Sequence, residues 1–142
     1  MNKHAQIQQK SHTSGTMLRS PRSMKGPAMV FDLDWEMLKL QSEIRELGAN
    51  RSAKTLVKEP GLAVTMVFLK KGAAIKRHIS PGDLAIQTLT GKIRLNLPID
   101  TVELPAGRVL LLERQISHDV VALEDSCFLL TAGLSDHEEH SG

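Results

Sequence analysis

The sequence predicts an all-β barrel that is preceded by one short helix, and three observations support this fold class. From Thr55 onward, nine short runs of β-branched or aliphatic residues alternate with Gly, Pro and Asp punctuation. No helical period interrupts these runs, and several of them are apolar on both faces. Many short strands without an intervening helix favour a sandwich or a closed barrel.

The expected strands follow the apolar runs between turn-forming residues. They are Thr55–Lys58, Leu62–Leu69, Ala74–Ile79, Asp83–Leu89, Lys92–Leu97, Thr101–Leu104, Val109–Glu113, His118–Leu123 and Cys127–Thr131. Two runs, Leu62–Leu69 and Cys127–Leu130, have more apolar surface than one barrel and one helix can cover. This surplus predicts a homodimer that forms through a sheet edge or face.

A helix is expected over about residues 32–47, outside the barrel. Asp32 or Asp34 can cap its start, and Gly48 is its natural end. Trp35 is interpreted as the residue that anchors the helix by packing, whereas Lys54 is interpreted as a solvated position. The apolar residues of the helix lie at Met37, Leu38, Leu40, Ile44 and Leu47.

The charge distribution divides the chain into a basic tail and a mildly acidic domain. Residues 1–28 have five basic and no acidic residues, so the remainder has 13 basic and 16 acidic residues, or a charge of −3. Because the tail lacks a hydrophobic period, we expect disorder over 1–28, a folded domain over 29–135 with its barrel at about 55–133, and a flexible tail over 136–142. A basic face for nucleic acid is not visible on the folded part.

The chain is expected to work in the cytoplasm. Its single cysteine, Cys127, excludes an internal disulfide and lies in an apolar run, which is typical of a small buried hydrophobe. No apolar stretch approaches the ~20 residues that span a membrane. The N-terminus has no apolar segment of the kind found in secretory signals.

The order of glycines and histidines in the β region resembles the paired motifs of the cupin superfamily. The first motif reads G-x5-H-x-H-x3,4-E-x6-G, and here Gly72 precedes His78 by that spacing. The second motif is a P-x-G, a strand and a histidine, and here Pro105-x-Gly107 is followed by His118. The resemblance covers residues from about 62 to 131 and implies a small RmlC-like cupin, a double-stranded β-helix barrel of the jelly-roll type.

The resemblance also implies where a metal would bind, and the chain departs from that pattern. Metal-binding cupins supply two His and one Glu from the first motif and one His from the second. Here only His78 and His118 remain; Ser80 replaces the second His, and the Glu position falls on Leu84 or Ala85. If the spacing puts the Glu position on Ala85, Gln87 shares that strand face and can complete a His78–His118–Gln87 metal site. If the spacing puts the Glu position on Leu84, Gln87 faces the opposite side of the strand.

Three functions follow from these residues. The first is a small-molecule binding or sensing module whose apolar barrel pocket is oriented by His78, Ser80, Gln87 and His118. The second is a metal-dependent enzyme of the dioxygenase or isomerase type that holds Fe, Mn, Ni or Zn weakly. The third is a ligand-free homodimer. The C-terminal His137-Glu138-Glu139-His140 run is interpreted as a solvated tail.

Overall fold

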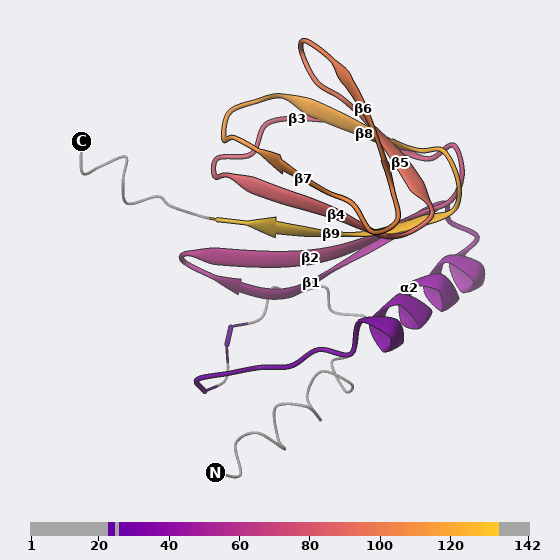
Figure 1. Cartoon of the computed structure of the whole chain (residues 1–142). Helices are drawn as coiled ribbons and strands as arrows, with labels where there is room; N and C mark the ends of the chain where they lie inside the picture. Colours follow the sequence, from indigo (N-terminus) through magenta and orange to yellow (C-terminus); the bar gives the residue numbers. More distant parts are fainter. Residues whose placement is uncertain (1–22, 25, 134–142) are drawn as a thin grey trace, which may run out of the picture.

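The computed structural model describes residues 23, 24 and 26–133, so most of the basic tail and all of 136–142 lie outside the described residues. The described part contains one helix followed by nine strands (Figure 1). These are α2 (Leu33–Leu47), β1 (Arg51–Glu59), β2 (Leu62–Leu69), β3 (Ala74–His78), β4 (Leu84–Thr90), β5 (Lys92–Asn96), β6 (Thr101–Pro105), β7 (Val109–Leu112), β8 (His118–Ala122) and β9 (Ser126–Ala132). The predicted order of elements is confirmed.

Helix α2 begins and ends at the residues that the sequence singles out. The Asp32 carboxylate accepts a hydrogen bond from the Trp35 backbone N–H at 3.1 Å, which caps the first turn. Gly48 ends the helix in the left-handed region, with φ at 65°. Acidic residues in the first turn and Arg45 in the last turn complement the helix dipole.

The face that α2 buries differs from the predicted one. Leu40 and Ile44 are buried against the outer face of the sheet, and Glu36, one turn before Leu40, is buried beside them. Trp35 is 40% exposed, with the Lys39 ammonium 5.9 Å from its ring centre. The interpretation of Trp35 as the packing anchor is therefore wrong, because position 35 lies about 100° around the helix from the Glu36–Leu40–Ile44 row.

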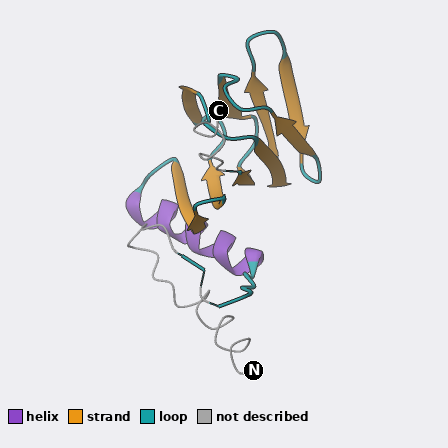
Figure 2. Ribbon diagram, turned by 90° about the vertical axis from the view of Figure 1, so that its left-hand side faces the viewer, coloured by secondary structure: helices purple, strands orange, loops and turns teal. Residues whose placement is uncertain are grey.

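Two antiparallel sheets form the barrel. The larger sheet has the order β1-β2-β9-β4-β7, and the smaller has the order β3-β8-β5-β6. Figure 2 shows α2 lying against two strands at one side, with the rest of the barrel beyond them. The first strand begins at Arg51 rather than at the predicted Thr55, because pairing with β2 continues up to Leu69 even where β1 is polar.

The barrel interior is filled by aliphatic side chains from both sheets and by Phe128. A second apolar cluster lies outside the larger sheet, where Met66, Phe68 and Cys127 contact the helix. Burial raises the pKa of the Cys127 thiol to about 12, so this cysteine is an inert buried group. The strands β2 and β9 are apolar on both faces, and the helix covers much of their outer face.

Lys54 is buried under the helix, contrary to the solvated position that the sequence predicts. Its Nζ lies 2.8 Å from Glu36 Oε1, and both side chains are almost fully removed from solvent. Two residues earlier in β1, the Ser52 hydroxyl donates to Glu43 of the same helix. Polar contacts as well as apolar ones therefore fix the position of α2 on the sheet.

Candidate functional site

The two histidines of the paired motifs meet at one end of the barrel. His78 is the last residue of β3 and His118 is the first residue of β8, and the two are register partners across that strand pair. Their ring centres lie 4.3 Å apart with the planes tilted by 60°. The two rings therefore lie together at the end of the barrel where the β3–β4 and β7–β8 loops emerge, with His78 exposed there.

Both rings are held in the same way by backbone carbonyl groups two residues earlier in the chain. His78 Nδ1 lies 2.8 Å from Lys76 O, and His118 Nδ1 lies 2.9 Å from Ile116 O. A carbonyl oxygen only accepts a hydrogen bond, so each Nδ1 carries the ring proton. In the neutral pair, each Nε2 then presents a lone pair.

The two rings differ in burial. His78 is exposed, whereas His118 is 1% exposed and shares the inward face of β8 with Val120 and Ala122. Burial lowers the pKa of His118, against a smaller upward effect of its bond to Ile116 O, and the neighbouring His78 lowers it further. The neutral form of His118 is therefore favoured near neutral pH.

The loops that surround the pair are tied to each other. The Gln115 backbone N–H donates to Ser80 O at 3.0 Å, and the Arg114 backbone N–H donates to Asp83 Oδ1 at 2.9 Å. The backbone hydrogen bond from Arg114, followed by the one from its guanidinium, lowers the pKa of the Asp83 carboxyl below its ordinary value. Gln115 has a φ of 70°, a left-handed conformation for which the sequence holds no signal.

Ser80 takes part in its own loop. Its hydroxyl donates to Gly82 O at 2.9 Å, and its side chain is only partly buried. The hydroxyl thus stabilises the turn between β3 and β4. Ser80 lies at the mouth of the barrel, close in sequence to His78, but its role in this structure is local.

Gln87 does not join the histidines. It is exposed and alternates along β4 with the buried Ile86 and Thr88, so its side chain points out of the barrel. Its register partner Leu129 packs toward the helix on that same outer face. Placing Gln87 in the pocket and in the metal set is therefore a wrong prediction, because the inward residues of β4 are Leu84, Ile86 and Thr88.

Leu84 occupies the inward position that the family motif gives to glutamate. It is 8% exposed and packs in the barrel core. The distance from Leu84 to Gly91 leaves six residues between them, as the motif requires, whereas Ala85 leaves five. This spacing was the signal in the sequence that could have placed Gln87 outside.

The donor set at the mouth does not fit a tightly held metal. It consists of two imidazoles, a hydroxyl that is engaged in its own turn, and a leucine in the place of the carboxylate. Within residues 26–133, no three His, Cys, Asp or Glu side chains are grouped so that they could hold a metal ion. Structural and catalytic divalent ions in proteins use three or four ligands.

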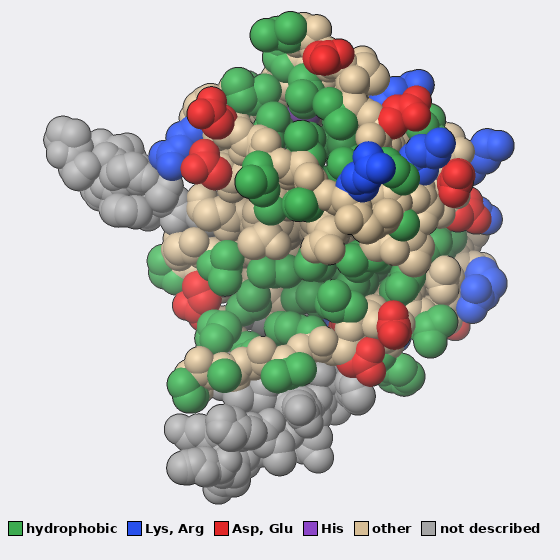
Figure 3. All heavy atoms as spheres, in the orientation of Figure 1, with side chains coloured by type: hydrophobic (Ala, Val, Ile, Leu, Met, Phe, Trp, Pro, Cys, Tyr) green, Lys and Arg blue, Asp and Glu red, His purple; other side chains and the backbone are tan. Residues whose placement is uncertain are grey.

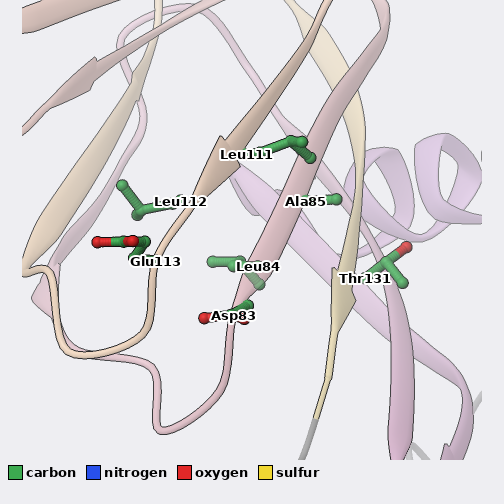
Figure 4. A pocket seen from close by; sticks show the side chains of 7 residues that line it. All are labelled: Asp83, Leu84, Ala85, Leu111, Leu112, Glu113 and Thr131. Atoms are coloured by element: carbon green, nitrogen blue, oxygen red, sulfur yellow. The ribbon is translucent and has the colours of Figure 1, made fainter.

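A separate hollow of about 380 Å³ lies at the edge of the larger sheet, on β4, β7 and β9. Figure 4 shows Leu111, Ala85 and Thr131 along it, with the carboxylates of Asp83 and Glu113 at one end. Neither histidine lines this hollow. It is a mainly apolar depression of the surface.

Neither a protein-family model nor a curated protein matches the chain, but solved structures do. A conserved protein of unknown function from Streptococcus pyogenes is 26% identical, with a TM-score of 0.62 over 82% of this chain and 96% of that one. An RmlC-like cupin with a double-stranded β-helix fold from Methanocaldococcus jannaschii is 12% identical, with a TM-score of 0.59 over 63% of this chain and 85% of that one. The chain has the cupin fold.

Enzymes also share this cupin fold. A salicylate 1,2-dioxygenase variant from Pseudoaminobacter salicylatoxidans is 13% identical, with a TM-score of 0.71 over 93% of this chain and 43% of that one. At this identity the likeness concerns the fold, and cupin barrels carry unrelated functions. No helix among the described residues is long and apolar enough to span a membrane.

Proposed function

We propose that this cupin binds a small molecule at the mouth of its barrel, through His78 and His118. The observation that carries the proposal is the paired arrangement of the rings, each anchored through Nδ1 so that Nε2 is left for a ligand. Anchoring of this kind orients an imidazole before the ligand arrives, which reduces the ordering cost of binding.

The burial of the surrounding residues supports a shallow site rather than a deep cavity. Ile86, Ile93 and Leu95 are fully buried and fill the barrel interior. Ile79 is exposed beside His78, and Ile116 is partly buried against the core beside His118. A ligand would therefore rest an apolar part on these side chains while a polar group meets the imidazoles.

A screen of small molecules by thermal shift tests this proposal, with untagged protein and two matched variants. His78→Phe and His118→Phe keep an aromatic ring and remove the nitrogens. Gln87→Ala, on the outer face of β4, is the control. Compounds that raise the melting temperature of the natural protein and of Gln87→Ala should lose their effect in both His variants. Compounds that stabilise all four proteins equally would overturn the proposal.

The alternative is a metal-dependent enzyme, and the Nδ1 anchors favour it in one respect. Metal-binding histidines usually donate the other ring nitrogen to a carbonyl or carboxylate, as both rings do here. Against it stands the finding that, among the described residues, no three His, Cys, Asp or Glu side chains are grouped so that they could hold a metal ion. Metal analysis of untagged protein decides: about one Fe, Mn, Ni or Zn per chain, lost in His118→Phe, would favour the enzyme.

We also propose that two copies pair through the β7 edge of the larger sheet, and that the protein works in the cytoplasm. β7 ends the sheet order and exposes Val109 and Leu111, the latter by 75%. Figure 3 shows hydrophobic side chains gathered across the middle of one face of the molecule. The single buried thiol of Cys127 suits a reducing compartment.

A further inference from the structure

The anchored rings restrict what kind of polar group the site can accept. Because Lys76 O and Ile116 O each accept from an Nδ1–H, both neutral rings are the Nδ1-protonated tautomer. Each Nε2 is then a hydrogen-bond acceptor and not a donor. A site built from one histidine of each tautomer would offer a donor and an acceptor, whereas this pair offers two acceptors.

Solvent reaches the acceptor of the buried ring. Among the described residues, one side-chain nitrogen or oxygen atom is buried without a hydrogen-bond partner, and it is Oε2 of Glu36 in helix α2. Nε2 of His118 is thus not sealed, although the residue as a whole is 1% exposed. Since Nδ1 is engaged by Ile116 O, Nε2 is the ring nitrogen that remains for a ligand.

We infer that the ligand of this site is a neutral, hydroxyl-bearing molecule in which an O–H group donates to Nε2 of His118 or of His78. The inference rests on the proposed function and adds the chemical class of the ligand to it. A carboxylate or phosphate would point its lone pairs at two acceptors, which is repulsive. An ether or ester oxygen has no proton to donate, so it leaves both acceptors unpaired.

Two measurements on the whole chain, in buffer with EDTA, test the inference. Nitrogen-15 NMR of the histidine rings should show the proton on Nδ1 in both residues, with signals assigned by their loss in His78→Phe and His118→Phe. Phenol, anisole and benzoate, which share a ring and differ in the polar group, then serve as probes. Phenol should bind about three- to tenfold more tightly than anisole, which is the range of one net hydrogen bond, and benzoate should bind weakest.

The outcomes separate the inference from the function on which it rests. In the double variant His78→Phe/His118→Phe the preference for phenol over anisole should disappear, while Gln87→Ala should keep it. If the three probes bind at the histidines with equal affinity, or if either ring carries its proton on Nε2, the pocket stands and the inference is wrong. If no probe shifts the histidine signals, the binding site itself is wrong and the inference is overturned with it.

Discussion

At the scale of single residues, Gly91 and His118 control how the protein responds to mutation and pH. Gly91 joins β4 to β5 with φ at 82°, and the backbone of Asp125 and Ser126 passes directly over it. His118 is an ionisable ring inside an aliphatic barrel. The backbone conformation at Gly91 determines how much stability a substitution there costs, and the burial of His118 determines how stability depends on pH.

Replacing Gly91 by alanine should destabilise the fold strongly. The new Cβ would overlap Asp125 O and lie 2.8 Å from Ser126 Cα, so the turn between β8 and β9 would have to shift. Gly72→Ala is the matched control, since Gly72 has a φ of 89° but open space around it. We expect a cost of about 1–2 kcal/mol for Gly72→Ala from the left-handed backbone alone, and a larger one for Gly91→Ala by urea unfolding. Equal costs would contradict this.

The stability of the protein should fall as the pH falls below about 6.5, the ordinary pKa of histidine. Burial lowers the pKa of His118 in the folded state, so the unfolded chain takes up the proton first and the slope of stability against pH is positive there. Urea unfolding between about pH 8 and pH 5 measures the slope. In His118→Phe the slope should flatten, and an unchanged slope would count against this assignment.

At the scale of elements, the helix is positioned by a buried ion pair in an otherwise apolar contact. Glu36 and Lys54 meet between α2 and β1, beside Leu40 and Met66. One oxygen of Glu36 has no hydrogen-bond partner. Taking two charges out of water is costly, so such a pair mainly selects one position of the helix rather than adding stability.

Breaking this pair from one side should cost more than removing it whole. Lys54→Met leaves the buried Glu36 carboxylate without its cation, at about 3–5 kcal/mol. The double variant Glu36→Leu/Lys54→Met should recover most of that loss, as measured by urea unfolding. Arg77→Met, which breaks the exposed Arg77–Asp119 pair, is the control and should cost at most about 1 kcal/mol. A double variant as unstable as Lys54→Met would refute this role.

At the scale of the whole molecule, the helix and the barrel define which surfaces of the described residues remain for partners. Helix α2 packs on the outer face of the larger sheet, where it contacts residues of β2 and β9. Figure 1 shows the helix beside β1 and β2. The β7 edge keeps Leu111 in solvent, next to the hollow on β4 and β9. An uncovered edge strand with apolar side chains invites pairing with another chain.

Light scattering at micromolar concentration should give twice the 15.6 kDa mass of one chain. Leu111→Glu should shift the protein to the single-chain mass, because a charge on the edge opposes pairing. Leu47→Glu is the control, since Leu47 is similarly exposed but lies at the end of the helix. A natural protein of single-chain mass, or a Leu111→Glu dimer, would exclude β7 as the interface.

A chain that begins at Met29 should fold as stably as the full chain. Residues 23, 24 and 26–28 are exposed, and the contact found there is the hydrogen bond from the Met24 backbone to Glu59. Trypsin should remove the basic tail and leave a resistant core, and the melting temperature of the shortened chain should stay within a few degrees. A larger loss would show that the tail contributes to folding.

The sequence by itself determined the features of this protein that depend on local pattern. The alternation of apolar runs and turn residues placed all nine strands, and the Asp32 and Gly48 caps bounded the helix. The glycine-to-histidine spacings put His78 and His118 on matching positions of paired strands. Each of these signals lies within a few residues of the element that it predicts. The predictions therefore agree with the structure, because tertiary contacts did not alter these local features.

Only the tertiary structure decided which residues are buried together and how the site is oriented. Glu36 rather than Trp35 faces the sheet because Lys54, from β1, meets it there. The Nδ1 anchors of the two histidines depend on the backbone turns at Lys76 and Ile116. These outcomes arise from contacts between segments far apart in the chain, and no pattern within one segment encodes its partner.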